Sequence, residues 1–191
     1  MERIKSFIDS QSAFILRALA KYEKAASMKT EYIDGGEVRS LGRPYKLSLK
    51  TGEGYDVSGK ICGNVIYVTA PDGETAEHVV TRLLNERLAE YIGEVLPRIY
   101  EQVRPLGVPV PQVKIKYMKS CWGSCIPAKR RVAFSTMLRE YPTEAVDYVI
   151  LHELAHFLHQ DHSKDFYAVI ERFMPDWKKR KALLKNSVPN I

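Results

Sequence analysis

The stretch "VILHELAHFLHQDHSKDF", residues 149–166, holds four of the five histidines of the chain, His152, His156, His159 and His162. In a helix, residues four positions apart lie on the same face, so His152 and His156 can direct two imidazole nitrogens at one point. Glu153 is rotated away from that point but can reach a water bound there. This H-E-x-x-H spacing is typical of helices in which two histidines bind zinc and the glutamate is a general base. We interpret the cluster as a metal site and not as a chance grouping of surface residues.

The surrounding sequence predicts the helix that such a site requires. Pro142 and Thr143 are typical of a helix start, and we expect Thr143 to be the N-cap. The helix is predicted to run to about His159. Apolar residues recur along it at helical spacing and form a stripe of Val146, Val149, Ile150, Leu154, Phe157 and Leu158.

A catalytic zinc generally has three protein ligands and an open fourth position. His159 lies a full turn beyond the first pair on the same helix and is expected to point past the metal. His162 follows "QD", where the helix should end, so the chain can turn back and present its ring from another direction. We therefore predict His162 as the third ligand. The alternatives are His159 and an acidic residue from the following helix.

The rest of the chain predicts an α+β protein. A helix is expected over residues 2–26, and a small antiparallel β-sheet over about 31–70, where β-branched stretches alternate with glycine-rich turns. A long helix should cover about 75–103, kinked or divided at Pro97. We expect a division into residues 1–72, the first helix with the small sheet, and residues 73–191, the core that carries the histidines.

The second half of the chain is predicted to contain two more strands and a helical C-terminus. The expected strands are "PQVKIKYM" (111–118) and "RRVAFST" (130–136), joined by a loop with the sequence "KSCWGSCIPAK" (119–129). Ser163 is a candidate N-cap for a helix over about 164–173, and Pro175 should begin a final basic helix.

Composition limits the class of protein. The chain has 191 residues, 45% of them hydrophobic, which is enough for one core. No apolar segment approaches the roughly 18 residues of a membrane span. Three cysteines and no evident secretory signal predict a cytoplasmic protein. The net charge of +6 comes partly from "KRR" (129–131) and "KKRK" (178–181), which we interpret as solvated surfaces, although such runs can contact phosphates.

Cys121 and Cys125 raise the question of a second metal site. Their spacing is compatible with zinc, but a second pair of ligands is needed, and Cys62 alone does not provide it. We interpret them as thiols without a metal. Trp122, which lies between them, is predicted to be a packing anchor.

Several motifs resemble those of the YgjP-like metal-dependent hydrolases, which are related to SprT-like zinc metalloproteins. They are "LGRPYKLSL" (41–49), "WGSC" (122–125), "DYVILHELAH" (147–156), "HSKDF" (162–166) and "MPDWKKRK" (174–181). The resemblance implies a zincin-like core with the H-E-x-x-H helix. It also implies His152, His156 and His162 as metal ligands and Glu153 as the catalytic carboxylate. The chain departs from the family pattern at Cys121, where a basic residue is usual, at Ile126, where a small residue is usual, and at its start, where the family has two strands.

The leading hypothesis is a zinc-dependent hydrolase of peptide bonds, in which the metal activates a water and Glu153 is the general base. Ni, Co and Fe are also compatible with three imidazoles. The first alternative is a hydrolase of nucleotide phosphoanhydrides, and the second is a nucleic-acid-associated zinc module. No membrane partner is expected. The group that stabilises the developing oxyanion is left open among Tyr148, Tyr167, Ser124 and Arg139.

Overall fold

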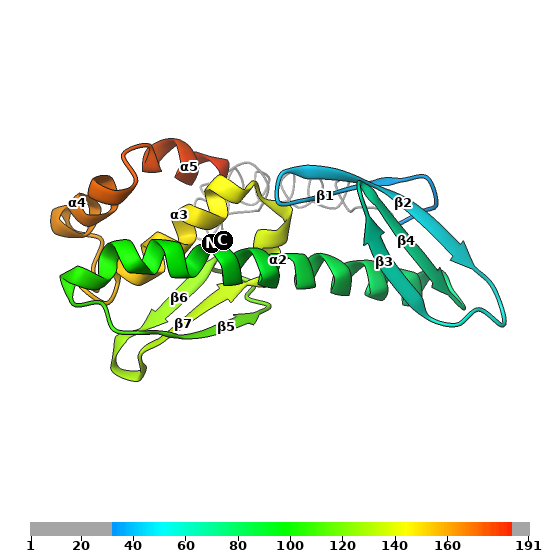
Figure 1. Cartoon of the computed structure of the whole chain (residues 1–191), viewed down its shortest axis with the longest axis horizontal. Helices are drawn as coiled ribbons and strands as arrows, with labels where there is room; N and C mark the ends of the chain where they lie inside the picture. Colours follow the sequence, from blue (N-terminus) through cyan, green and yellow to red (C-terminus); the bar gives the residue numbers. More distant parts are fainter. Residues whose placement is uncertain (1–31, 185–191) are drawn as a thin grey trace, which may run out of the picture.

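The computed structural model describes residues 32–184, so the helix predicted over residues 2–26 lies outside the described part. A long helix, α2 (Gly73–Val103), runs through the middle of the molecule (Figure 1). One sheet lies at one end of α2, and a second sheet and three further helices surround its other end. The predicted α+β class, with a small sheet in the N-terminal half, is confirmed. No helix within residues 32–184 is long and apolar enough to cross a bilayer.

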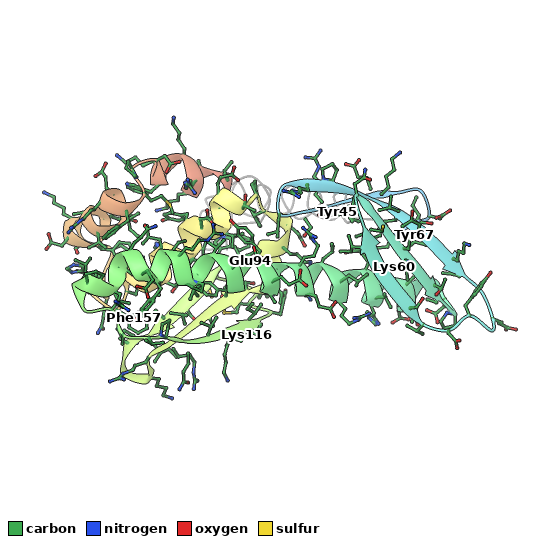
Figure 2. All side chains as sticks on the ribbon, viewed as in Figure 1. Tyr45, Lys60, Tyr67, Glu94, Lys116 and Phe157 are labelled. Carbon is green, nitrogen blue, oxygen red and sulfur yellow. The ribbon has the colours of Figure 1, made fainter. Side chains whose placement is uncertain are left out.

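The N-terminal sheet contains β1 (Glu37–Ser40), β2 (Arg43–Thr51), β3 (Ser58–Cys62) and β4 (Val65–Ala70) in the order β1-β2-β4-β3. The β2–β4 pair is parallel, so the sheet is mixed and the prediction of a purely antiparallel sheet is wrong. The reason is burial. Ile66, Val68 and Ala70 of β4 are buried, which favours the centre of the sheet for β4, while the more polar β3 forms the edge. Lys60 and Tyr67, which are cross-strand partners, lie on the exposed face (Figure 2).

Helix α2 connects the two ends of the molecule. The Asp72 carboxylate caps it by accepting a hydrogen bond from the Thr75 amide at 2.7 Å. The helix continues through Pro97 without dividing, because Val95 and Ile99 on either side are buried in the core. Its first half packs on the N-terminal sheet through Ala76, Val79, Val80, Leu83 and Leu84, and its second half enters another core through Leu88, Ile92, Val95, Ile99 and Val103. The division at residue 72 stays a prediction.

The second sheet contains β5 (Gln112–Lys116), β6 (Gly123–Ile126) and β7 (Arg131–Ser135) in the order β5-β7-β6. Strand β5 is parallel to β7 and β6 is antiparallel to it. The prediction of a loop over 119–129 is therefore wrong for 123–126. Gly123 and Ser124 carry little strand propensity, and β6 forms because it pairs with the buried strand β7.

The remaining helices are α3 (Thr143–Ala155), α4 (Lys164–Phe173) and α5 (Trp177–Leu183). Pro142, not Thr143, occupies the N-cap of α3, because its carbonyl accepts the first helical hydrogen bonds, from Ala145 and Val146. The helix ends at Ala155, short of the predicted His159, and a turn follows. Ser163 caps α4 as predicted, with its hydroxyl accepting from the Phe166 amide.

Candidate metal centre

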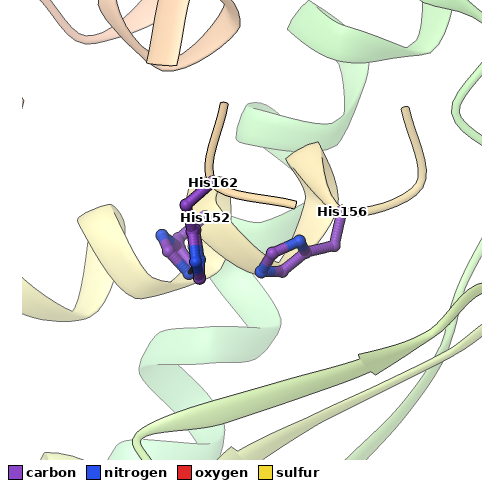
Figure 3. Close-up of side chains that lie close together, drawn as sticks. All are labelled: His152, His156 and His162. Carbon is purple, nitrogen blue, oxygen red and sulfur yellow. Dashed lines mark hydrogen bonds between the residues drawn. The ribbon is translucent and has the colours of Figure 1, made fainter. Parts of the chain in front are cut away.

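Three histidines from the end of α3 and the loop after it face one another (Figure 3). His152 lies in the last turn of α3, His156 is its C-cap residue, and His162 precedes α4. Each offers one ring nitrogen, and these three nitrogens lie within 4.8 Å of one another. The Nε2 atoms of His152 and His162 are 3.0 Å apart. The three predicted ligands are therefore close enough to hold one metal ion.

Neighbouring groups fix how these rings point. The Nδ1 atom of His152 lies 3.3 Å from the Tyr148 hydroxyl, and the Nδ1 atom of His156 lies 3.1 Å from the carbonyl oxygen of His159. When each Nδ1 carries the proton, the Nε2 atoms remain free to ligate a metal. The Phe166 ring packs against all three imidazoles, with centroid distances of 4.8–4.9 Å. His159 supplies its backbone carbonyl to the arrangement, and its ring is not in the group of three.

The electrostatic environment favours neutral imidazoles. Burial lowers the pKa of His152 to about 3, helped by repulsion from His156 and His162 when they are protonated and from Lys181. Burial also lowers the pKa of His156. Neutral imidazole is the form that binds metal, and three such donors fit a zinc site with an open position.

Glu153 is buried, with 5% of its surface exposed, next to β6. Burial raises the pKa of its carboxyl to about 8. A Cβ atom at Gly123 would lie 2.5 Å from Oε1 of Glu153, so the absence of a side chain at position 123 makes room for this carboxylate. The glycine of the "WGSC" motif is thus explained by close approach to Glu153.

A cavity of about 770 Å³ contains these groups. Its wall includes Gly123, Ser124 and Cys125 of β6, the three histidines and Glu153, and Lys181 of α5. Sequence reasoning missed Lys181, because it interpreted "KKRK" as one solvated run. In the structure Lys178 and Lys179 are exposed, Arg180 pairs with Asp147 and Asp176, and Lys181 lines the cavity.

The other residues named in the sequence analysis divide into two groups. Tyr148 and Ser124 line the cavity, whereas Tyr167 and Arg139 are not part of the cavity wall, and Arg139 binds Asn85 and Glu140. Trp122 packs edge-on against Tyr141 at 4.6 Å between centroids, as expected of a packing anchor, and it also lines the cavity.

The two cysteines that flank Trp122 also line the cavity. In the part of the chain that the structure describes, neither joins a group of three potential metal ligands. Burial raises the pKa of Cys125 to about 12, helped by the negative charge of Glu153, so its thiol is protonated at neutral pH.

Comparisons with known proteins identify the family. A search of curated proteins gives no match. Among solved structures, the metallopeptidase zymogen jannalysin of Methanocaldococcus jannaschii is similar, with 18% sequence identity, 49% of this chain and 93% of that chain covered, and a TM-score of 0.44. The family model described as "YgjP-like, metallopeptidase domain" matches residues 1–187, nearly the whole chain, and confirms the resemblance drawn from the motifs. The chain therefore belongs to the YgjP-like metallopeptidase-domain family.

Proposed function

We propose that this protein is a zinc-dependent peptidase in which His152, His156 and His162 hold the metal and Glu153 is the general base. Membership of a metallopeptidase-domain family supports a metal-dependent hydrolase. The observation that carries the finer proposal is the position of β6. It lies at one edge of its sheet and lines the same cavity as Glu153 and the three histidines.

The donor set supports zinc. Three imidazoles with their nitrogens within 4.8 Å of one another match the common catalytic zinc site. When bound, such a metal supplies a Lewis acid that polarises a carbonyl oxygen and lowers the pKa of water. Tyr148 and the carbonyl of His159 would keep the rings of His152 and His156 in the orientation that leaves Nε2 available.

Glu153 has the environment of a general base. Its carboxylate lies beside the histidines in a buried position, where burial raises the pKa to about 8. A bound cation would favour the ionised carboxylate. Glu153 would then accept a proton from the attacking water and transfer it to the leaving amine, which requires a pKa near the working pH.

Strand β6 supports a peptide substrate. Within residues 32–184 it pairs with β7 along one edge only, which leaves backbone N–H and C=O groups of its other edge available. An extended peptide can add to such an edge as a further strand. That mode of binding would place a backbone carbonyl of the peptide beside the three histidines.

The alternative functions have less support. A nucleoside triphosphate brings several negative charges, yet Lys181 is the only lysine or arginine among the described residues that line the cavity. For the nucleic-acid alternative, the "KKRK" run does not form one basic surface, because Arg180 is paired with two carboxylates and Lys181 faces the cavity.

The Glu153→Gln variant tests the proposal. Zinc-loaded wild-type protein and variant are incubated with a mixture of peptides, and the products are identified by mass spectrometry. We expect the variant to keep its zinc and to lose hydrolysis by a factor of about 10² to 10⁴, the usual contribution of a general base. Glu144→Gln is the matched control, since Glu144 lies exposed on the same helix. Wild-type rates in Glu153→Gln would exclude its role as the base. Hydrolysis of a nucleoside triphosphate with no peptide cleaved would exclude the peptidase.

A further inference from the structure

Lys181 of α5 is a partly buried cation in the wall of the cavity. Its ammonium group donates a hydrogen bond to the Tyr167 hydroxyl at 3.2 Å. It also lies over the rings of Tyr167 and Trp177, at 5.4 Å and 5.8 Å from their centroids. These two aromatic rings stack on each other at 4.7 Å. The ammonium group is therefore held in place by contacts that do not neutralise its charge.

Lys181 has no ionic partner within residues 32–184, because none of the ion pairs there includes it. The preceding residue is a useful contrast. Arg180 is bound by Asp147 at 3.3 Å and by Asp176 at 2.9 Å. Arg180 therefore links α5 to α3 through its ion pair with Asp147, whereas the adjacent Lys181 lines the cavity without such a pair.

The position of Lys181 relates it to the three histidines. Tyr167, to which it donates, stacks on His162 with 6.2 Å between centroids. Lys181 also lines the same cavity as the three histidines and Glu153. An anionic group bound by Lys181 would therefore lie next to the bond that the metal and Glu153 act on.

We infer that Lys181, held in place by Tyr167, forms a subsite for a carboxylate of the peptide substrate, next to the scissile bond. This inference rests on the proposed peptidase function. The Lys181 ammonium donates one of its three N–H bonds to Tyr167, so two remain able to donate to a carboxylate. One ammonium with two N–H bonds left to donate matches the charge and the two oxygens of a carboxylate. The carboxylate can come from an acidic side chain or from the C-terminus of the peptide.

The test uses a peptide that the zinc-loaded wild-type protein cleaves, made in three N-acetylated forms. The first has a C-terminal amide and no carboxylate. The second carries a glutamate beside the scissile bond, and the third carries a free C-terminal carboxylate. We measure kcat/KM for each form and, separately, its equilibrium binding to zinc-loaded Glu153→Gln protein. The variants are Lys181→Met, which keeps the length of the side chain, Lys181→Arg, which keeps the charge, and Lys179→Met, an exposed control on the same helix.

We expect the second or the third form to bind about 10- to 100-fold more tightly than the first, as for a hydrogen-bonded ion pair. Tighter binding of the second form would identify the carboxylate as an acidic side chain, and tighter binding of the third form would identify it as the C-terminus. Lys181→Met should abolish the preference, and its zinc content and thermal unfolding, compared with those of the wild-type protein, show that it is folded. Lys181→Arg should retain part of the preference, and Lys179→Met all of it.

Three results would overturn the inference. Cleavage of all three forms with equal kcat/KM and equal binding would exclude the subsite but leave the peptidase function intact, as would an undiminished preference in Lys181→Met. Failure of the wild-type protein to cleave any peptide would instead exclude the proposed function, and the carboxylate subsite with it.

Discussion

Each of the two sheets of this protein places a glycine against a helix. One glycine makes room for apolar side chains and the other for a carboxylate. Gly59 of β3 faces α2, where an added Cβ would collide with Val79 and lie 3.1 Å from Leu83. Gly123 of β6 faces α3, where an added Cβ would lie 2.5 Å from the carboxylate of Glu153. At the first sheet the space is filled by an apolar side chain, and at the second by a buried acid.

This difference extends to the two cores. The core under the N-terminal sheet is built from aliphatic residues and Tyr45, and α2 supplies nearly half of it. The second core shares α2 but adjoins the buried Glu153 and the three histidines. Burial of those groups shifts the pKa of Glu153 upward and that of His152 downward. Among the described residues, the one buried carboxyl therefore lies at the proposed site in the second half of the molecule, and the first half has no buried carboxyl.

The largest effect is expected from Gly123→Ala. The new methyl group would displace the Glu153 carboxylate, and a shift of about 1 Å in a catalytic group lowers activity by about 10²-fold. Peptide hydrolysis should fall by that factor, while zinc content remains close to that of the wild-type protein. Activity within twofold of wild type would show that hydrolysis does not depend on the space that Gly123 leaves for Glu153. The two glycines would then not differ in their effect on activity.

Gly59→Ala should have the opposite profile. Overpacking against Val79 and Leu83 is expected to lower the free energy of unfolding by about 1–3 kcal/mol. Peptide hydrolysis at a temperature well below the transition should be unchanged, because the site lies at the other end of α2. Urea denaturation measures the stability. Gly93→Ala is the control, since a Cβ there meets nothing within 4 Å and should stabilise the helix slightly. Equal effects of both substitutions on stability would show that the β3–α2 contact is not tight.

A smaller effect concerns the thiols. Cys62 and Cys121 are exposed, whereas burial and the charge of Glu153 raise the pKa of Cys125 to about 12. At pH 8 we expect iodoacetamide to modify Cys125 last, because the thiolate is the reactive form. Its rate should rise about tenfold for each pH unit between 8 and 10, as the thiolate fraction does. Peptide mass spectrometry follows each cysteine. If Cys125 is modified at pH 8 as fast as Cys121, the Cys125 thiol is not desolvated.

The candidate site could be predicted from sequence because its geometry is local. His152 and His156 are one helical turn apart, and His162 follows in the loop after the helix, although the helix ends at Ala155 and not at "QD". The same local signals located α2, α3 and α4, and Ser163 as a cap. The bonding roles of the histidines and of Glu153 remain predictions, which the experiments above address.

What could not be predicted depends on contacts between distant segments. Strand β6 exists because β7 is beside it, and the parallel pairing of β2 with β4 depends on which strand the core buries. Lys181 was missed for the same reason. The three residues before it, 178–180, are all basic, and only the packing of α5 on α3 and α4 distinguishes Lys181 from them by turning it toward Tyr167 and the cavity.

The central claim is that one zinc ion is held by His152, His156 and His162. The most direct test is the zinc content of purified protein, measured by elemental mass spectrometry, for wild type, His162→Ala and His159→Ala. His159 contributes only its backbone carbonyl to the arrangement, so its variant is the matched control. We predict about one zinc per chain in wild type and in His159→Ala, and markedly less in His162→Ala. Full zinc content in His162→Ala, or its loss in His159→Ala, would contradict the assignment.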